Sequence, residues 1–198
     1  MNSKFFDLKK EKQDRMINAV LKVFALQGYR HGSTDDIVRE AAISKGLLFH
    51  YFGSKLGAYR FVYDYSVRYM NLELRSAMGA GERDLFVIMK QIEYARMRAM
   101  KGYPYMQQFL NRSQWEDSCE ALLSVEEKRN VLAETYAAID GQIDYNALPA
   151  GVDGKKLRKM LDFTIKGLLA EGFQDASFQP EILYEEICGY LDMIKSIL

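Results

Sequence analysis

The sequence predicts an all-α fold of about nine helices. Apolar residues recur three and four positions apart along most of the chain, and no segment alternates between apolar and polar residues as a half-buried strand does. The chain has 198 residues, of which 48% are hydrophobic and 27% are charged, so two globular domains at most are expected. No apolar run reaches the roughly 18 residues of a membrane-spanning helix, and the first residues lack the apolar stretch of a signal peptide. We therefore expect a cytoplasmic protein.

Three helices are expected in the N-terminal part of the chain. Apolar side chains at helical spacing within residues 17–24 predict the first helix, which Gly28 can end in the left-handed conformation. Ser33 or Thr34 can cap the second helix, and Ser44 can cap a short third helix, because their hydroxyl oxygens accept hydrogen bonds from the first helical amides.

Six further helices complete the prediction. A long helix begins at Ser54 or Lys55 and ends before Gly79. Ser124 and Glu127 form the S-x-x-E pattern of a capping box, which predicts a helix start after a polar loop over 113–124. Pro180 is a favourable first residue for the last helix. The five helices after the long one are expected at about 82–101, at 104–112, from 124 through 139, at 154–172 and at 180–197.

The charges of the chain are unevenly distributed, although 27 Lys and Arg balance 27 Asp and Glu. Residues 1–55 hold ten basic and six acidic side chains, whereas the remainder holds 17 basic and 21 acidic ones. No acidic residue occurs between Ala41 and Tyr63. Because nucleic-acid phosphates attract Lys and Arg and repel carboxylates, this window is suited to a polyanionic partner.

The segment Ser33–Lys55 carries the most specific functional signal. A short helix, a tight turn and a second short helix form the helix-turn-helix plan, in which the second helix enters the major groove of DNA. Leu48 and Phe52 are four residues apart and can both face the core, which leaves the other side chains from Lys45 to Tyr51 to divide the surface. Lys45 can then reach a guanine edge or a phosphate.

Twelve residues of this segment form the run T-x-x-I-x-x-x-A-x-I-S-K-G-x-L-x-x-Y-F-x-S-K, namely Thr34, Ile37, Ala41, Ile43, Ser44, Lys45, Gly46, Leu48, Tyr51, Phe52, Ser54 and Lys55. The run closely resembles the N-terminal signature of the TetR family of transcriptional repressors. The similarity extends over about residues 10–60, and the rest of the chain is similar to that family only in length and helical layout.

The resemblance implies that nine residues contact DNA, namely Thr34, Ser44, Lys45, Gly46, Leu47, Phe49, His50, Tyr51 and Lys55. Two of these depart from the family's pattern. Phe49 stands where a tyrosine is usual, so one hydroxyl contact to phosphate is missing. Leu47 stands where a small or hydroxylated residue is common, which changes the expected base preference.

The resemblance also implies the organisation and the partners of the chain. Residues 1–54 would form the DNA-binding domain, and residues 55–198 would form a helical effector-binding and dimerisation domain. The expected function is that of a ligand-responsive repressor, which binds a palindromic operator in double-stranded DNA as a homodimer and is released by a small-molecule effector. An alternative is a factor of the same fold that is controlled by a protein partner or by DNA.

Methionine and aromatic side chains suit an adaptable apolar pocket, although the same spacing is typical of an ordinary helical core. The candidate pocket residues are Phe86, Met89, Met97, Met100, Tyr103, Met106, Phe109, Trp115, Tyr136 and Phe163. The last two helices carry apolar stripes that exceed the needs of one core. The candidate residues of a homodimer interface are Leu161, Leu168, Leu183, Tyr190 and Ile194.

An enzyme is the less favoured class. The sequence contains no HExxH pattern, no Glu-x-x-His pair and no glycine-rich phosphate loop. Cys119 and Cys188 lie far apart, which argues against a disulfide framework, and His31 and His50 have no cysteine nearby to form a zinc site. We expect no cofactor and no metal.

Overall fold

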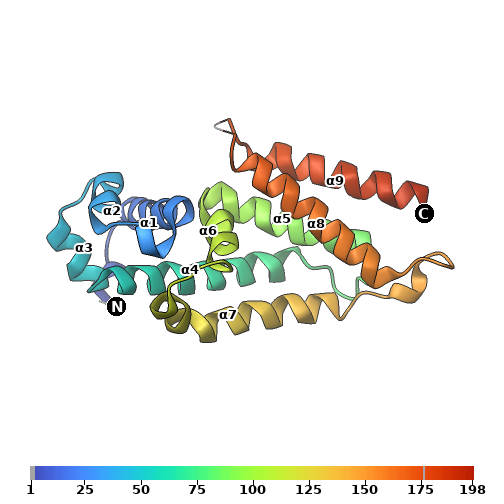
Figure 1. Ribbon diagram of the computed structural model, residues 1–198, viewed down its shortest axis with the longest axis horizontal. Helices are drawn as coiled ribbons and strands as arrows, with labels where there is room; N and C mark the ends of the chain where they lie inside the picture. The colour runs from blue at the N-terminus through green and yellow to red at the C-terminus, as the bar shows by residue number, and fades with distance from the viewer. Residues whose placement is uncertain (1–2, 176) are drawn as a thin grey trace. The chain divides into compact units, whose positions relative to one another are not determined.

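The computed structural model describes residues 3–175 and 177–198, and within them it contains helices and no strand, as the sequence predicts. The elements are labelled in Figure 1. They are η1 (Ser3–Phe5), α1 (Lys10–His31), α2 (Thr34–Ala41), α3 (Lys45–Phe52), α4 (Lys55–Ala77), α5 (Leu85–Gly102), α6 (Met106–Ser113), α7 (Cys119–Asp140), η2 (Tyr145–Ala147), α8 (Gly154–Gly172) and α9 (Pro180–Ile197). No helix of the described residues is long and apolar enough to span a membrane.

The chain divides into two compact units. Unit 1 contains residues 1–69 and 102–133, and unit 2 contains residues 70–101 and 134–198. This division differs from the predicted boundary between residues 54 and 55. The physical reason is that the first part of α4 and all of α6 share a core with α1–α3. The assignment of separate roles to the two predicted domains stays a prediction.

Aromatic side chains form the core of unit 1. The ring of Tyr59 on α4 is almost completely buried, and its centroid lies 5.2 Å from those of Phe24 and Tyr29 and 5.5 Å from that of Phe109. Each such ring pair contributes about 0.5–1.5 kcal/mol beyond the burial of its area. Tyr59 therefore joins α4 to both α1 and α6.

Serine caps are present at three successive helices, and the first two of them were predicted. The side-chain oxygen of Ser33 accepts a hydrogen bond from the Asp36 amide at 3.0 Å, and that of Ser44 accepts one from Leu47 at 3.2 Å. At the start of α4, Ser54 accepts from the Gly57 amide at 2.9 Å. These caps fix the beginnings of the helices that form the candidate site.

Gly28 bends the first helix instead of ending it. Its φ of 72° is in the left-handed region that was predicted, but α1 continues past the kink to His31. The kink frees the amide of Tyr29, which donates a hydrogen bond to the Glu116 carboxylate at 2.8 Å. A side chain from the α6–α7 connection thus accepts the hydrogen bond of the amide that the kink leaves without a helical partner.

The predicted start of the seventh helix at Ser124 is wrong, because α7 begins at Cys119. The Ser124 hydroxyl lies inside the helix and donates to the Ala121 carbonyl at 2.7 Å. Ala121 and Val125 are both buried, so the apolar face of α7 begins one turn earlier than the S-x-x-E pattern suggests. The predicted loop over 113–124 shortens to the residues between α6 and α7.

In unit 2, α8 packs against α9. The buried contact residues recur every four positions and are Leu157, Leu161, Ile165 and Leu169 on α8 and Leu183, Ile187 and Leu191 on α9. This is the interval that places side chains on one face of a helix.

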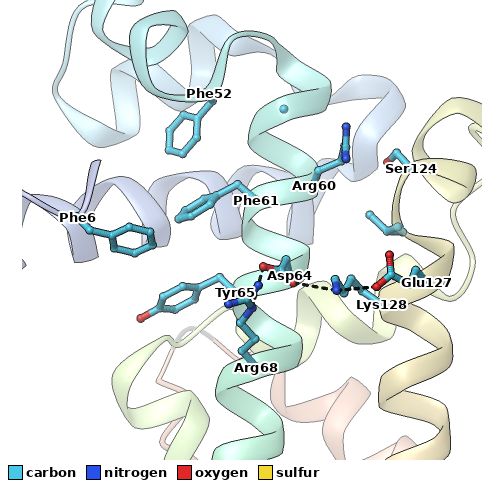
Figure 2. Close-up of a pocket in the computed structure, with 12 residues that line it drawn as sticks. Phe6, Phe52, Arg60, Phe61, Asp64, Tyr65, Arg68, Ser124, Glu127 and Lys128 are labelled. Carbon is cyan, nitrogen blue, oxygen red and sulfur yellow. Dashed lines mark hydrogen bonds and ion pairs between the residues drawn. The ribbon is translucent and has the colours of Figure 1, made fainter. Parts of the chain in front are cut away.

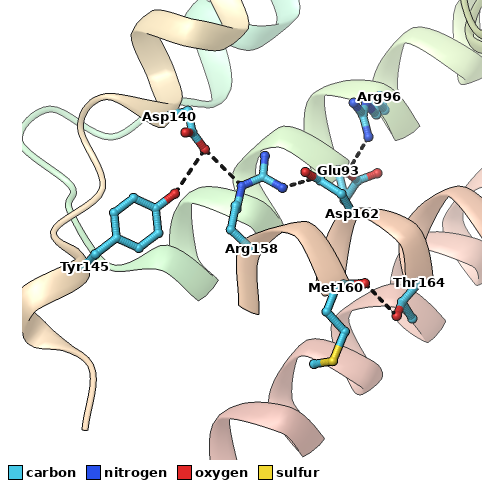
Figure 3. Close-up of polar contacts among 8 residues, drawn as sticks. All are labelled: Glu93, Arg96, Asp140, Tyr145, Arg158, Met160, Asp162 and Thr164. Atoms are coloured by element: carbon cyan, nitrogen blue, oxygen red, sulfur yellow. Dashed lines mark hydrogen bonds and ion pairs between the residues drawn. The ribbon is translucent and has the colours of Figure 1, made fainter. Parts of the chain in front are cut away.

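A cluster of charged side chains also lies within unit 2 (Figure 3). Glu93 on α5 is buried and accepts a hydrogen bond from Arg96 at 2.6 Å. Burial raises the pKa of Glu93, against the opposing effect of the Arg96 charge. Arg158 on α8 pairs with Asp162 and lies 3.1 Å from Asp140 on α7. The contact between Arg158 and Asp140 joins α8 to α7 through a charge-assisted hydrogen bond, whereas the Glu93–Arg96 bond lies within α5.

Candidate nucleic-acid interface

The α2–α3 segment forms a helix-turn-helix. The turn contains Ala42, a non-glycine residue with a φ of 50°, whose amide donates to the Arg39 carbonyl. The next amide, from Ile43, donates to the Val38 carbonyl at 3.1 Å. These bonds close the end of α2 and redirect the chain into α3. The left-handed residue was missed from the sequence, because alanine rarely adopts this conformation.

Leu48 and Phe52 are both buried, as predicted for the side of α3 that faces the core. Tyr51 was expected at the surface but is only 8% exposed, because its ring packs against Phe5 with centroids 5.6 Å apart. The N-terminal η1 segment that supplies Phe5 was not predicted. A contact between the Tyr51 hydroxyl and a phosphate stays a prediction.

The opposite side of α3 is open. Lys45, Gly46, Phe49 and His50 are exposed, and Leu47 is half-buried. A Cβ atom added to Gly46 would meet nothing within 4 Å, so a large partner can approach the backbone there. The exposed surface therefore contains five of the nine predicted DNA-contact residues.

Two lysines at this surface already have partners. The Nζ atom of Lys45 lies 2.8 Å from an oxygen of Asp35 on α2, and both side chains are largely exposed. Lys55 donates to the Arg30 carbonyl at 3.3 Å, and its Nζ lies 4.5 Å from the centre of the Tyr29 ring. Burial lowers the pKa of Lys55, with the carboxylates of the α6–α7 region acting in the opposite direction.

Thr34 and Ser44 lie at the starts of the two helices. Thr34 is the first residue of α2 and is half-buried, and Ser44 is the exposed cap of α3. Helix N-termini present free amides and a partial positive charge, which suits phosphate oxygens. Contacts of Thr34 and Ser44 with phosphate stay a prediction.

Gly57 is a structural residue that sequence reasoning missed. A Cβ atom at this position would lie 1.8 Å from the carbonyl oxygen of Phe52. Only glycine therefore permits the close passage between the end of α3 and the start of α4. The signal available in the sequence was a glycine in the first turn of an otherwise good helix, where it costs stability unless packing requires it.

The candidate effector residues are distributed over both units. Unit 1 contains Tyr103, Met106, Phe109 and Trp115, and unit 2 contains Phe86, Met89, Met97, Met100, Tyr136 and Phe163. Trp115 is 86% exposed and Phe163 is 62% exposed, whereas Tyr136 is half-buried and the other seven are buried. Tyr136 lines an open pocket of about 380 Å³. The shared role of these residues in effector binding stays a prediction.

The candidate dimer residues also differ in their exposure. Leu161 and Leu183 are buried, Leu168 and Ile194 are half-buried, and Tyr190 is 39% exposed. Other large apolar side chains are exposed on α8 and α9, namely Met160, Phe163, Ile182, Met193 and Ile197. The apolar surface that could meet a second copy is thus mostly different from the predicted set.

Comparison with known proteins agrees with the helix-turn-helix assignment. Residues 16–57 match the model of the family described as "Bacterial regulatory proteins, tetR family". An uncharacterised HTH-type transcriptional regulator of Bacillus subtilis, YuxN, is 29% identical over 147 residues. The match covers 65% of this chain and 50% of YuxN, so the chain spans about half the length of that relative.

Solved structures share the fold. A TetR family regulator from Chloroflexus aurantiacus has a TM-score of 0.66 at 19% identity, with 99% of this chain and 95% of that chain covered. A putative fatty acid metabolism regulator of Clostridium perfringens has a TM-score of 0.62 at 19% identity, with coverages of 89% and 96%. FadR from Bacillus subtilis, solved in complex with stearoyl-CoA, has a TM-score of 0.56 at 15% identity, with the same coverages.

The family model describes regulatory proteins and not enzymes, in agreement with the expectation from the sequence. The helix-turn-helix geometry and the match over residues 16–57 lead to one conclusion: the N-terminal segment of this chain is a helix-turn-helix of the kind that the model of the TetR family of bacterial regulatory proteins describes.

Proposed function

We propose that this chain is a DNA-binding repressor, which binds a palindromic operator as a homodimer and is released by a small-molecule effector. The observation that carries the proposal is the exposed side of α3, a helix-turn-helix recognition helix in a stretch without acidic residues. A helix of this kind reads base edges in the major groove while neighbouring groups bind phosphates.

Electrostatics supports DNA as the partner. The acid-free stretch between Ala41 and Tyr63 contains α3 and the start of α4, together with Lys45, Lys55 and Arg60. The nearest acidic partner of this surface is Asp35, whose carboxylate forms an ion pair with the Lys45 ammonium in the free protein. A phosphate or a guanine edge can replace that exposed partner at little cost, because exposed ion pairs are weak.

The exposed apolar side chains of α8 and α9 support a homodimer. Side chains such as Phe163 on α8 and Met193 on α9 are more than half exposed, and exposed apolar surface that gathers into a patch is typical of interaction sites. A two-fold dimer would present two copies of α3, which a palindromic operator would match.

An effector is supported by likeness alone. FadR of Bacillus subtilis, which shares the fold, is solved with stearoyl-CoA. We propose that a small molecule likewise binds this chain and favours the state with low DNA affinity. It can shift the equilibrium only by the difference between its affinities for the two states.

Selection from random DNA duplexes tests DNA binding directly. We expect the purified chain to enrich a palindromic sequence with half-sites about one helical turn apart. Lys45→Gln should bind the selected duplex more weakly and with altered base preference, whereas Lys166→Gln, an exposed lysine on α8, serves as the charge-matched control. Failure to enrich any sequence would contradict the proposal.

A further inference from the structure

A groove in unit 1 is lined by none of the nine predicted DNA-contact residues. It has a volume of about 430 Å³ and is lined by Phe6 in the connection between η1 and α1, and by residues from the end of α3, from α4 and from α7 (Figure 2). Half of its lining residues lie on the first part of α4, between Gly57 and Arg68. The volume is sufficient for a small organic molecule.

One side of the groove is aromatic. Phe6, Phe61 and Tyr65 lie on the same side of α4 in Figure 2, with Phe52 above them. Phe6 is 52% exposed although it packs against Phe61 at 6.3 Å between centroids. A half-exposed ring beside other rings provides a surface on which an apolar or aromatic body can stack.

The other side of the groove is charged. Arg60, Glu127 and Lys128 lie there, toward α7. Asp64 pairs with Arg68 at 2.9 Å and with Lys128 at 3.8 Å, and Lys128 also pairs with Glu127 at 2.9 Å. Both acidic side chains of the groove are therefore matched by cations.

Arg60 is the remaining charged side chain of the groove lining. Its exposed side chain makes no hydrogen bond or ion pair with the described residues, and it points from α4 toward Ser124 in Figure 2. A guanidinium presents a planar set of donors that fits a carboxylate through two hydrogen bonds. The lining as a whole carries three cations and two anions, so the charge left over favours an anion.

We infer that this groove binds an amphipathic organic acid from solution. Its apolar body lies on Phe6, Phe61 and Tyr65, and its carboxylate pairs with Arg60 on the charged side of the groove. Phe52, the last residue of α3, contacts the same groove, so the bound acid touches the end of the recognition helix. The binding itself does not rest on the proposed DNA-binding function.

Calorimetric titration of the full chain tests this site with two probes of equal shape. 2-Naphthoate carries the carboxylate, and 2-naphthamide is its uncharged counterpart. We expect naphthoate to bind the wild-type chain about tenfold more tightly than naphthamide, because a charge-assisted hydrogen bond contributes about that factor. Arg60→Gln should remove this preference for naphthoate, and Phe6→Ala should weaken the binding of both probes.

Two control variants outside the groove are matched to these changes. Arg75→Gln alters another exposed arginine of α4, and Leu72→Ala truncates a side chain of α4 that is 63% exposed. Both should leave naphthoate binding unchanged. The site is overturned if naphthoate does not bind at millimolar concentration, or if Arg60→Gln and Phe6→Ala bind it as tightly as the wild type. Because no DNA is present, this result is separate from the test of the DNA-binding proposal.

Discussion

Asp35 forms an ion pair with Lys45, a lysine of α3 that we propose to contact DNA. Its carboxylate lies 2.8 Å from the Lys45 Nζ atom, and both side chains are exposed. An exposed pair of this kind stabilises a fold by about 0.2–1 kcal/mol. The pair therefore has little structural value, but it places a negative charge beside the surface that we propose to meet phosphates.

Asp35→Asn should strengthen DNA binding. Removing the competing carboxylate frees Lys45, and we expect an affinity gain of about two- to fivefold, the equivalent of the pair's weak energy. Fluorescence anisotropy with a selected duplex measures the change. The double variant with Lys45→Gln completes a mutant cycle, and additive effects of the two changes would show that the ion pair does not matter.

Substitution by alanine should have different effects on the free energy of unfolding at Gly57 and at Gly46. Gly57→Ala places a Cβ 1.8 Å from a backbone oxygen, so we expect a loss of at least about 2 kcal/mol in the free energy of unfolding. Gly46→Ala meets nothing within 4 Å and should leave that free energy unchanged or raise it by up to about 1 kcal/mol. Urea denaturation of both variants compares them. Equal stabilities would contradict the close passage between α3 and α4.

At the scale of elements, short helices with strong caps were predictable. Ser33 and Ser44 cap α2 and α3 as expected, because the cap bond joins a side chain to a backbone amide only three residues away. The start of α7 was not predictable in the same way. Ser124 and Glu127 have the spacing of a capping box, but the burial of Ala121 in the tertiary core extends the helix beyond that local pattern.

The free energy of unfolding should depend strongly on both members of the Glu93–Arg96 pair of α5. Arg96→Met would leave a buried carboxylate without its cation, at a cost of about 3–5 kcal/mol to the free energy of unfolding. Adding Glu93→Gln should recover part of the loss. Chemical denaturation of the single and double variants measures both effects.

The same variant has a predictable pH dependence. Burial already raises the pKa of Glu93 above its ordinary value, and loss of the Arg96 charge raises it further. A group whose pKa is raised on folding stabilises the fold below its unfolded pKa and loses that contribution as pH rises. Arg96→Met should therefore be least destabilised in acid, and a constant deficit from pH 4 to pH 8 would contradict this interpretation of the pair.

At the scale of the whole molecule, the net charge of zero combines two unlike parts. Residues 1–55 have four more basic than acidic side chains, and the remainder has four more acidic ones. The sequence alone showed this asymmetry. It could not show which apolar residues of α8 and α9 face outward, because helical spacing identifies stripes but not their neighbours. Leu161 and Leu183 consequently proved to be buried within the subunit.

The oligomeric state should depend on the exposed apolar residues of α8 and α9. Met193 is 53% exposed, and a charge there would be buried without a partner in the proposed dimer. We expect light scattering at micromolar concentration to report a dimer for the wild type and a monomer for Met193→Asp. Leu72→Asp, at an exposed position of α4, is the control and should remain dimeric. A monomeric wild type would contradict the homodimer proposal.

The central claim is that the α3 surface binds operator DNA through both phosphates and bases. Its most direct test is the affinity for the selected duplex, measured over a range of salt concentrations. We predict a steep fall with rising salt, because each phosphate contact releases about one counterion. Lys55→Gln should reduce the slope by about one without changing base preference, whereas Lys45→Gln should also change the preferred bases. Binding that is independent of salt, or that neither variant alters, would contradict the claim.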